Sequence, residues 1–123
     1  MFLVASNKVK QLLFVSYIGQ VHPAEVAESK EDIRVLLAEL PSGFRLLADL
    51  SQLGTMDLDC LPEIGSIMEL LDQGGVSQIV RVIPAPEQDI GFNILTIFHY
   101  PHHPRIITFK SLAEAGKFLA IDR

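Results

Sequence analysis

Three aspartates, a serine and a cysteine lie close together near the middle of the chain. Asp49 and Ser51 end an apolar run, and Asp57, Asp59 and Cys60 follow shortly after. Carboxylates grouped in this way can recognise a cationic group or a basic partner surface. A thiol near a helix start can act as a nucleophile, because the helix N-terminus lowers its pKa. The chemistry that this cluster could support is therefore recognition by charge or attack by a thiolate.

Each of these residues also has a structural interpretation. Asp57 or Asp59 alone would more commonly cap a helix, since a carboxylate satisfies the N–H groups left without a partner at its start. Asp49, at a strand end, is first expected to accept hydrogen bonds from the following N–H groups. A lone Cys60 is more commonly a small core residue, and the sequence assigns it no His or Asn partner. For the loop as a whole, a contact surface and a structural role both stay open.

These residues belong to a strand, loop and helix unit over 44–75. Phe44–Leu50 is short and apolar enough for a central strand buried on both faces, and Ser51 closes it before a polar loop. Apolar residues then recur at three- and four-residue steps, which predicts a helix packed on a sheet. The residues of that stripe are Leu61, Ile64, Ile67, Met68 and Leu71. Gly74-Gly75 ends the helix, because glycine enters the left-handed conformation without steric cost.

The rest of the chain alternates strands and helices. Strands are predicted over 2–5, 11–18, 76–83 and 105–110, and helices over 23–40, 89–100 and from 111 onward. The stretch 89–100 also alternates as a strand would, but we favour a helix because a parallel sheet needs a crossover there. The predicted fold is a single α/β domain, 1–123, with a mixed, mostly parallel sheet of about five strands and four helices.

Composition narrows the classes of function. The 123 residues are 49% hydrophobic, which describes a chain with a sizeable core, and the formal net charge is −5. A net negative charge argues against binding nucleic acid or an anionic membrane through bulk electrostatics. A single cysteine, no signal peptide in the first residues and no run of ~20 apolar residues predict a cytoplasmic protein without a membrane span.

The sequence offers little support for an enzyme. His99, His102 and His103 lie across a proline-rich loop, with His22 elsewhere, and this spacing favours a solvated loop over a metal site. There is no glycine-rich phosphate loop and no nucleophile elbow. We therefore expect no catalytic residues, no metal and no cofactor.

The apolar stretch 89–100 suggests an alternative function. A helix that is apolar all round must be buried in the core, at a homodimer interface, or over a small apolar or lipid-like ligand. The core is the first expectation. In the ligand alternative the pocket residues would be Phe92, Leu95, Phe98 and Tyr100, with Arg81 placed to neutralise an anionic head group.

From Asp49 to Gly75 the chain resembles the STAS family, the domain of bacterial anti-sigma-factor antagonists and of sulfate-transporter tails. Its signature is a strand ending in Asp or Asn-Leu-Ser, a loop reaching Met-Asp-Ser-Ser-Gly, a helix and a Gly-Gly stop. The matching residues are Asp49-Leu50-Ser51, Met56-Asp57-Leu58-Asp59-Cys60-Leu61 and Gly74-Gly75, with no gap in their spacing. The resemblance is closest to the single-domain, SpoIIAA-like antagonists. It implies the SpoIIAA-like fold and a regulatory protein partner.

The chain departs from the family at the residue that matters for regulation. Family antagonists are switched by phosphorylation of a serine at the start of this helix, and the matching residue here is Asp59, followed by Cys60 in place of a glycine. An aspartate carries a permanent charge and is no substrate for a serine kinase. The sequence thus predicts a non-enzymatic binding module without the phospho-switch. Its partner-binding residues would be Asp49, Ser51, Met56, Asp57, Asp59 and Cys60.

Overall fold

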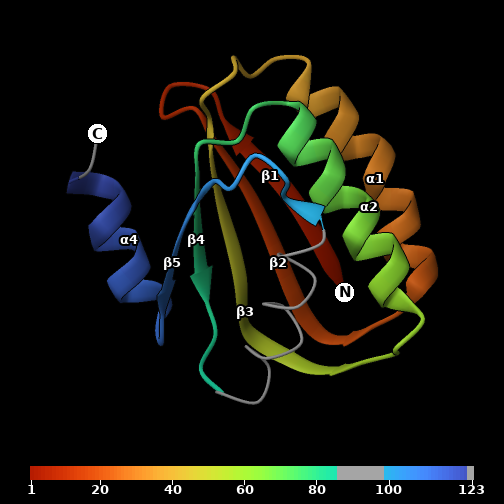
Figure 1. Cartoon of the computed structure of the whole chain (residues 1–123). Helices are drawn as coiled ribbons and strands as arrows, with labels where there is room; N and C mark the ends of the chain where they lie inside the picture. Colours follow the sequence, from red (N-terminus) through yellow and green to blue (C-terminus); the bar gives the residue numbers. More distant parts are fainter. Residues whose placement is uncertain (86–98, 122–123) are drawn as a thin grey trace.

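The computed structural model describes residues 1–85 and 99–121, which form a five-stranded sheet and three helices (Figure 1). The strands are β1 (Phe2–Asn7), β2 (Leu12–Val21), β3 (Arg45–Met56), β4 (Gln78–Val82) and β5 (Arg105–Phe109). The helices are α1 (Pro23–Leu37), α2 (Cys60–Gln73) and α4 (Leu112–Ile121). The helix predicted over 89–100 lies outside the described residues except at its last two positions. No helix in the described part is both long and apolar enough to cross a membrane.

The strands lie in the sheet in the order of the chain. β1 and β2 form an antiparallel hairpin, and β2, β3, β4 and β5 are parallel to one another. Parallel neighbours need crossovers, and α1 and α2 supply two of them because each follows one strand and precedes the next. The predicted mixed, mostly parallel sheet is confirmed.

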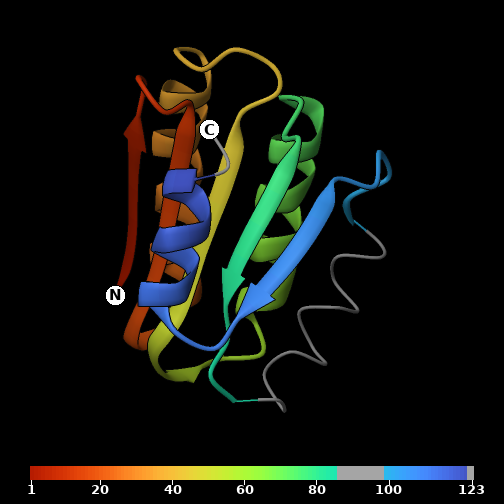
Figure 2. The same cartoon turned by 90° about the vertical axis from the view of Figure 1, so that its left-hand side faces the viewer.

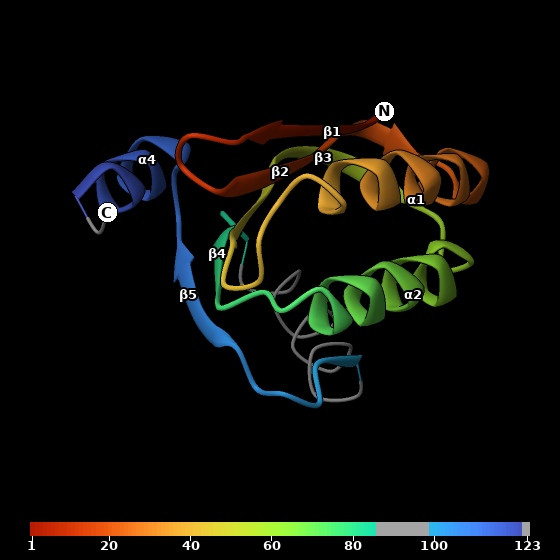
Figure 3. The same cartoon turned by 90° about the horizontal axis from the view of Figure 1, so that it is seen from above.

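The two faces of the sheet are covered differently. Seen from above, α1 and α2 lie on the concave side of the curved sheet, and α4 lies on the opposite side (Figure 3). The larger core fills the α1 and α2 side and includes Leu13, Val15, Tyr17, Val26, Ile33, Ile64, Met68 and Leu71. A smaller cluster of Leu47, Val80, Val82, Ala115 and Leu119 packs under α4. Because β3 and β4 contribute to both clusters, they are the buried centre of the sheet.

One prediction about β3 is wrong. Ser51 does not close the strand, and the residues after it do not form a polar loop, because β3 continues to Met56. The second half of β3 pairs with the second half of β2, from Ile18 opposite Gln52 to Val21 opposite Met56, with one register shift just before Ile18 and a second between Gly19 and Gln20. Pairing with the long strand β2 satisfies the backbone N–H and C=O groups of these residues, while their side chains stay exposed or half-buried. The side-chain pattern therefore does not reveal that the strand continues.

α4 is attached to the sheet by a buried arginine. Arg45, at the start of β3, donates from Nη1 and Nη2 to the Leu119 carbonyl, at 3.3 Å each. That carbonyl lies in the last turn of α4, where carbonyl groups lack helical donors and carry partial negative charge. At the other end of the helix the Ser111 hydroxyl accepts from the Glu114 N–H at 3.2 Å, which satisfies one of the N–H groups that lack a helical acceptor.

Candidate functional site

The turn between β3 and α2 presents an apolar side chain between two acids. β3 ends at Met56, and α2 begins at Cys60. Backbone hydrogen bonds from Cys60 to Asp57 and from Leu61 to Leu58, both 3.0 Å, fold the turn into the first part of the helix. The Leu58 side chain is 80% exposed. At this exposure the leucine does not pack in the core, and its side chain is accessible to another molecule.

The two acids that flank Leu58 differ in their contacts. The Asp57 carboxylate lies 3.6 Å from Nδ1 of His22, the N-cap residue of α1, so the approaches to α1 and α2 lie next to each other. Asp59 is the N-cap residue of α2, and it makes no side-chain hydrogen bond to the helix among the described residues. No side-chain hydrogen bond therefore supports a capping role for Asp59. The residue is exposed.

Cys60 is buried, in contrast to its neighbours. Its side chain is 0% exposed, and Sγ lies 3.6 Å from the Val21 carbonyl at the end of β2. Burial, and then the negative charge of Asp57, raise the pKa of the thiol. A protonated, enclosed thiol is a poor nucleophile, so the position suits the core interpretation. Cys60 supports the turn from beneath and does not reach its surface.

The structure separates the remaining predicted site residues from this turn. Asp49 and Ser51 lie roughly 20 Å back along β3 from Met56, at about 3.3 Å per residue. The Asp49 side chain is buried, and its Oδ1 accepts from the Ser51 N–H at 2.9 Å, as predicted for its structural role. Of the six predicted partner-binding residues, the turn brings together Met56, Asp57, Asp59 and Cys60, and of these four only the two aspartates are exposed.

Two residues at this site are not predicted from the sequence. Leu58 belongs to the family motif but is not a predicted site residue, and His22 is far from Asp57 along the chain. A large apolar residue between two aspartates just before a helix is a local pattern from which an exposed contact residue could have been predicted. The approach of His22 to Asp57 depends on how two crossovers end at the same edge of the sheet.

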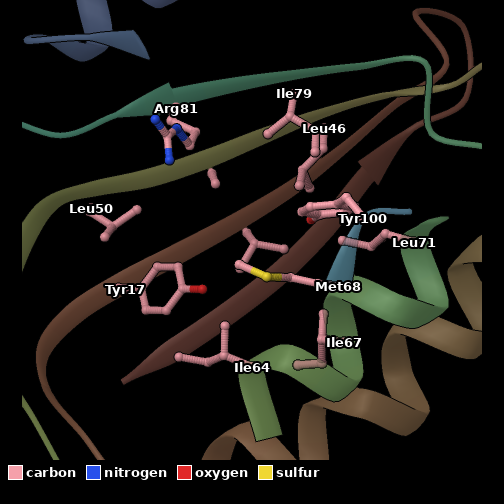
Figure 4. A pocket seen from close by; sticks show the side chains of 12 residues that line it. Tyr17, Leu46, Leu50, Ile64, Ile67, Met68, Leu71, Ile79, Arg81 and Tyr100 are labelled. Carbon is pink, nitrogen blue, oxygen red and sulfur yellow. The ribbon is translucent and has the colours of Figure 1, made fainter. Parts of the chain in front are cut away.

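A second candidate site is a cavity between the sheet and α2 (Figure 4). Its volume is about 40 Å³, and it is lined by Val15, Tyr17, Leu46, Ala48, Leu50, Ile64, Ile67, Met68, Leu71, Ile79, Arg81 and Tyr100. Pockets for small ligands typically measure ~300–1,000 Å³. The described residues therefore enclose room for only a few water-sized molecules.

The cavity contains two of the five residues of the predicted ligand pocket. Tyr100 and Arg81 line it, whereas Phe92, Leu95 and Phe98 lie outside the described residues. Arg81 donates from Nε and Nη2 to the Thr108 hydroxyl, at 3.1 and 2.8 Å. Burial raises the pKa of both Tyr17 and Tyr100 well above the ordinary value, so both phenols stay neutral.

The predicted histidine loop is tied to α2 by carboxylates. His99 Nδ1 lies 2.8 Å from the Glu69 carboxylate, and His102 Nδ1 lies 2.5 Å from the Asp72 carboxylate. Both carboxylates project from α2, three residues apart. Gly65, one turn before Glu69, lies under the His99 ring, and a Cβ built there would be 2.5 Å from Nε2. These histidines hold the chain that enters β5 against α2.

Comparison with known proteins identifies the architecture. No protein-family model matches the chain, and no curated protein matches it. Several solved structures match over nearly the whole chain. An uncharacterised DUF3478-family protein from Shewanella loihica PV-4, described as having a SpoIIAA-like fold, matches with a TM-score of 0.71 and 12% identity, covering 97% of this chain and 92% of that one. The unphosphorylated anti-sigma factor antagonist SpoIIAA matches with a TM-score of 0.66 and 14% identity, covering 98% and 99%.

This chain has the SpoIIAA-like fold. An anti-sigma factor antagonist from Mycobacterium paratuberculosis also matches, with a TM-score of 0.58 and 18% identity, covering 98% of this chain and 93% of that one. The fold expected from the STAS resemblance is therefore shown. At these identities the likeness concerns the fold, so the function has to be argued from the residues of this chain.

Proposed function

We propose that this protein is a non-enzymatic, cytoplasmic regulatory module that binds a protein partner at the turn before α2. The observation that carries the proposal is the Leu58 side chain, 80% exposed between two exposed aspartates. A few residues near the centre of an interface supply most of the binding energy, and charged residues around them select the partner. A partner with an apolar pocket rimmed by lysine or arginine would fit this turn.

The fold supports the same assignment. Two of the matching structures are anti-sigma factor antagonists, and the STAS resemblance places the regulatory element of such proteins at the start of this helix. In this chain Asp59 occupies the position of the switch serine. We infer that the contact is constitutive, because an aspartate has no hydroxyl that a serine kinase could phosphorylate.

Partner capture with two matched variants tests the proposal. Asp59→Lys reverses a charge in the turn, and Glu114→Lys makes the same change in net charge on α4. We expect Asp59→Lys and Leu58→Ser to lose, by about tenfold or more, a polypeptide that wild type and Glu114→Lys both retain. Equal capture by all four proteins would overturn the proposal. Intact mass of protein from its own cells should show no phosphate, and a phosphorylated fraction would refute a constitutive contact.

The cavity of about 40 Å³ is much smaller than a lipid-like ligand, which does not favour the ligand-carrier alternative. It stays a prediction about residues that lie largely outside the described part of the chain.

A further inference from the structure

β1 lies at one edge of the sheet, and among the described residues it pairs with β2 alone (Figure 2). At its start the Ile18 N–H donates to the Met1 carbonyl at 2.8 Å, and the Met1 amine donates to the Ile18 carbonyl at 2.6 Å. Bonded and non-bonded pairs alternate along an antiparallel ladder. Counting from this bonded pair, the N–H and C=O groups of Phe2, Val4 and Ser6 point away from β2 and are available to another strand.

This edge lacks the usual protection against pairing. The six residues of β1 include no charged residue and no proline, and the register with β2 runs through them without a bulge. Proteins normally protect edge strands with charged side chains, proline, bulges or a covering element. The strand at the opposite edge, β5, begins with Arg105 and is followed directly by Lys110. β1 is thus the edge suited to accept a further strand.

One face of α1 runs along β1, and it is acidic. The Glu25 carboxylate lies 3.5 Å from the Met1 amine, and Glu39 forms a 3.1 Å ion pair with Lys8 in the hairpin turn. These two contacts fix both ends of this face beside β1. Between them, at steps of three and four residues on the same face, lie the exposed side chains of Glu28, Asp32 and Val35.

Two of the four carboxylates on this face are not balanced by a neighbouring cation. Glu28 and Asp32 form no ion pair with any residue in the ranges 1–85 and 99–121. The basic residues of α1 lie on its other flank, where Lys30 donates to the Ser66 hydroxyl of α2. A strand added to β1 would therefore lie beside two uncompensated carboxylates.

Charge distinguishes the candidate occupants of this edge. If two copies of the chain paired through β1 about a two-fold axis, both α1 helices would lie on the same face of the joined sheet. Their acidic faces would then approach each other, which disfavours a second copy. A strand with cations at alternate positions would instead direct all of them towards α1, because alternate side chains share one face.

We propose that the β1 edge binds an extended polypeptide segment of a partner protein, with lysine or arginine at alternate positions, as a sixth strand of the sheet. Its backbone pairs with Phe2, Val4 and Ser6, and its cations lie against Glu28 and Asp32. Its other face packs beside Leu3, which is 46% exposed, and Ala5. This surface is separate from the turn before α2 and does not depend on the function proposed above.

A synthetic peptide tests the proposal directly. The probe has nine residues, with lysine at the even positions and threonine or valine at the odd ones; the comparison peptide has glutamate in place of lysine. We expect the lysine peptide to slow hydrogen exchange of the Phe2, Val4 and Ser6 amides in NMR spectra, with an affinity that falls as salt rises. We expect the glutamate peptide to do neither. Shifts confined to the turn at 57–61, or no protection in β1, would overturn the proposal.

Two variants separate backbone pairing from charge. Ser6→Pro removes one outward N–H without removing a bond to β2, and should weaken peptide binding about tenfold or more. Asp32→Lys should weaken it about five- to tenfold, whereas Glu114→Lys, with the same change in net charge, should not. Equal effects of the two charge reversals would mean that only bulk charge is sensed. A dimer in sedimentation that Ser6→Pro dissociates would make a second copy the occupant. If Ser6→Pro does not fold, the exchange data and the charge variants still decide.

Discussion

The buried Asp72 carboxylate accepts two hydrogen bonds from His102, one from its backbone N–H at 3.1 Å and one from Nδ1 at 2.5 Å. Asp72 lies near the end of α2, whereas His102 lies in the loop before β5. The Asp72 side chain is 3% exposed and the His102 side chain 77%. This pair connects the loop before β5 to α2 through a buried acceptor that water does not reach.

Removing the buried acceptor should cost more than removing the exposed ring. Asp72→Ala leaves the His102 N–H without its acceptor, and we expect it to lower the free energy of unfolding by about 1–3 kcal/mol. His102→Ala keeps the backbone bond and should cost less than about 1 kcal/mol. Urea denaturation of both variants measures the difference. Equal losses would show that the backbone bond contributes little.

The two glycines that end α2 should respond differently to alanine. Gly75 has φ of +88°, and a Cβ there would lie 2.1 Å from the Ser42 Oγ. Gly74 is right-handed, and its closest contact would be 3.3 Å. We expect Gly75→Ala to cost about 1–2 kcal/mol and Gly74→Ala about 0.5 kcal/mol or less, by thermal or urea unfolding. A larger cost at Gly74 would contradict the assignment of the left-handed residue.

The Cys60 thiol should be unreactive in the native protein. It is fully buried, and burial together with Asp57 raises its pKa, so raising the pH from 7 to 9 should produce little native thiolate. We expect labelling by a disulfide reagent to be about 100-fold slower than in denaturant, because it requires local opening. The unfolded chain, with an ordinary thiol pKa, should instead react faster as pH rises. Rapid stoichiometric labelling of native protein at pH 7 would contradict the burial of Cys60.

Gly65 and His99 should be energetically coupled. Alanine is favoured over glycine inside a helix by about 1 kcal/mol, but a Cβ at residue 65 displaces the His99 ring and disturbs its contact with Glu69. We expect Gly65→Ala to stabilise the His99→Ala background by about 1 kcal/mol and to give no such gain in wild type. A double-mutant cycle of unfolding free energies measures the difference. Full additivity would show that the ring moves aside without cost.

Local signals in the sequence were sufficient to predict the types of the elements and much of their order. Apolar residues at steps of three and four predicted α2, because burial of one helix face imposes this period. Apolar, β-branched runs predicted β4 and β5, as is typical of strands in a covered parallel sheet. The motif from Asp49 to Gly75 led to the SpoIIAA-like fold. The Gly74-Gly75 pair predicted the end of the helix, but the sequence does not determine which of the two glycines has the positive φ.

The tertiary structure decided which polar residues face water. Asp49 and Asp59 have the same side chain and each lies between two apolar residues in the sequence, yet Asp49 is 4% exposed on a central strand and Asp59 is exposed at a turn. The extension of β3 to Met56, the attachment of His102 to Asp72 and the acidic face of α1 beside β1 likewise join residues that are distant along the chain. Such contacts depend on how the strands pair and how the crossover helices pack. Neither can be predicted from the spacing of residues that are close together in the sequence.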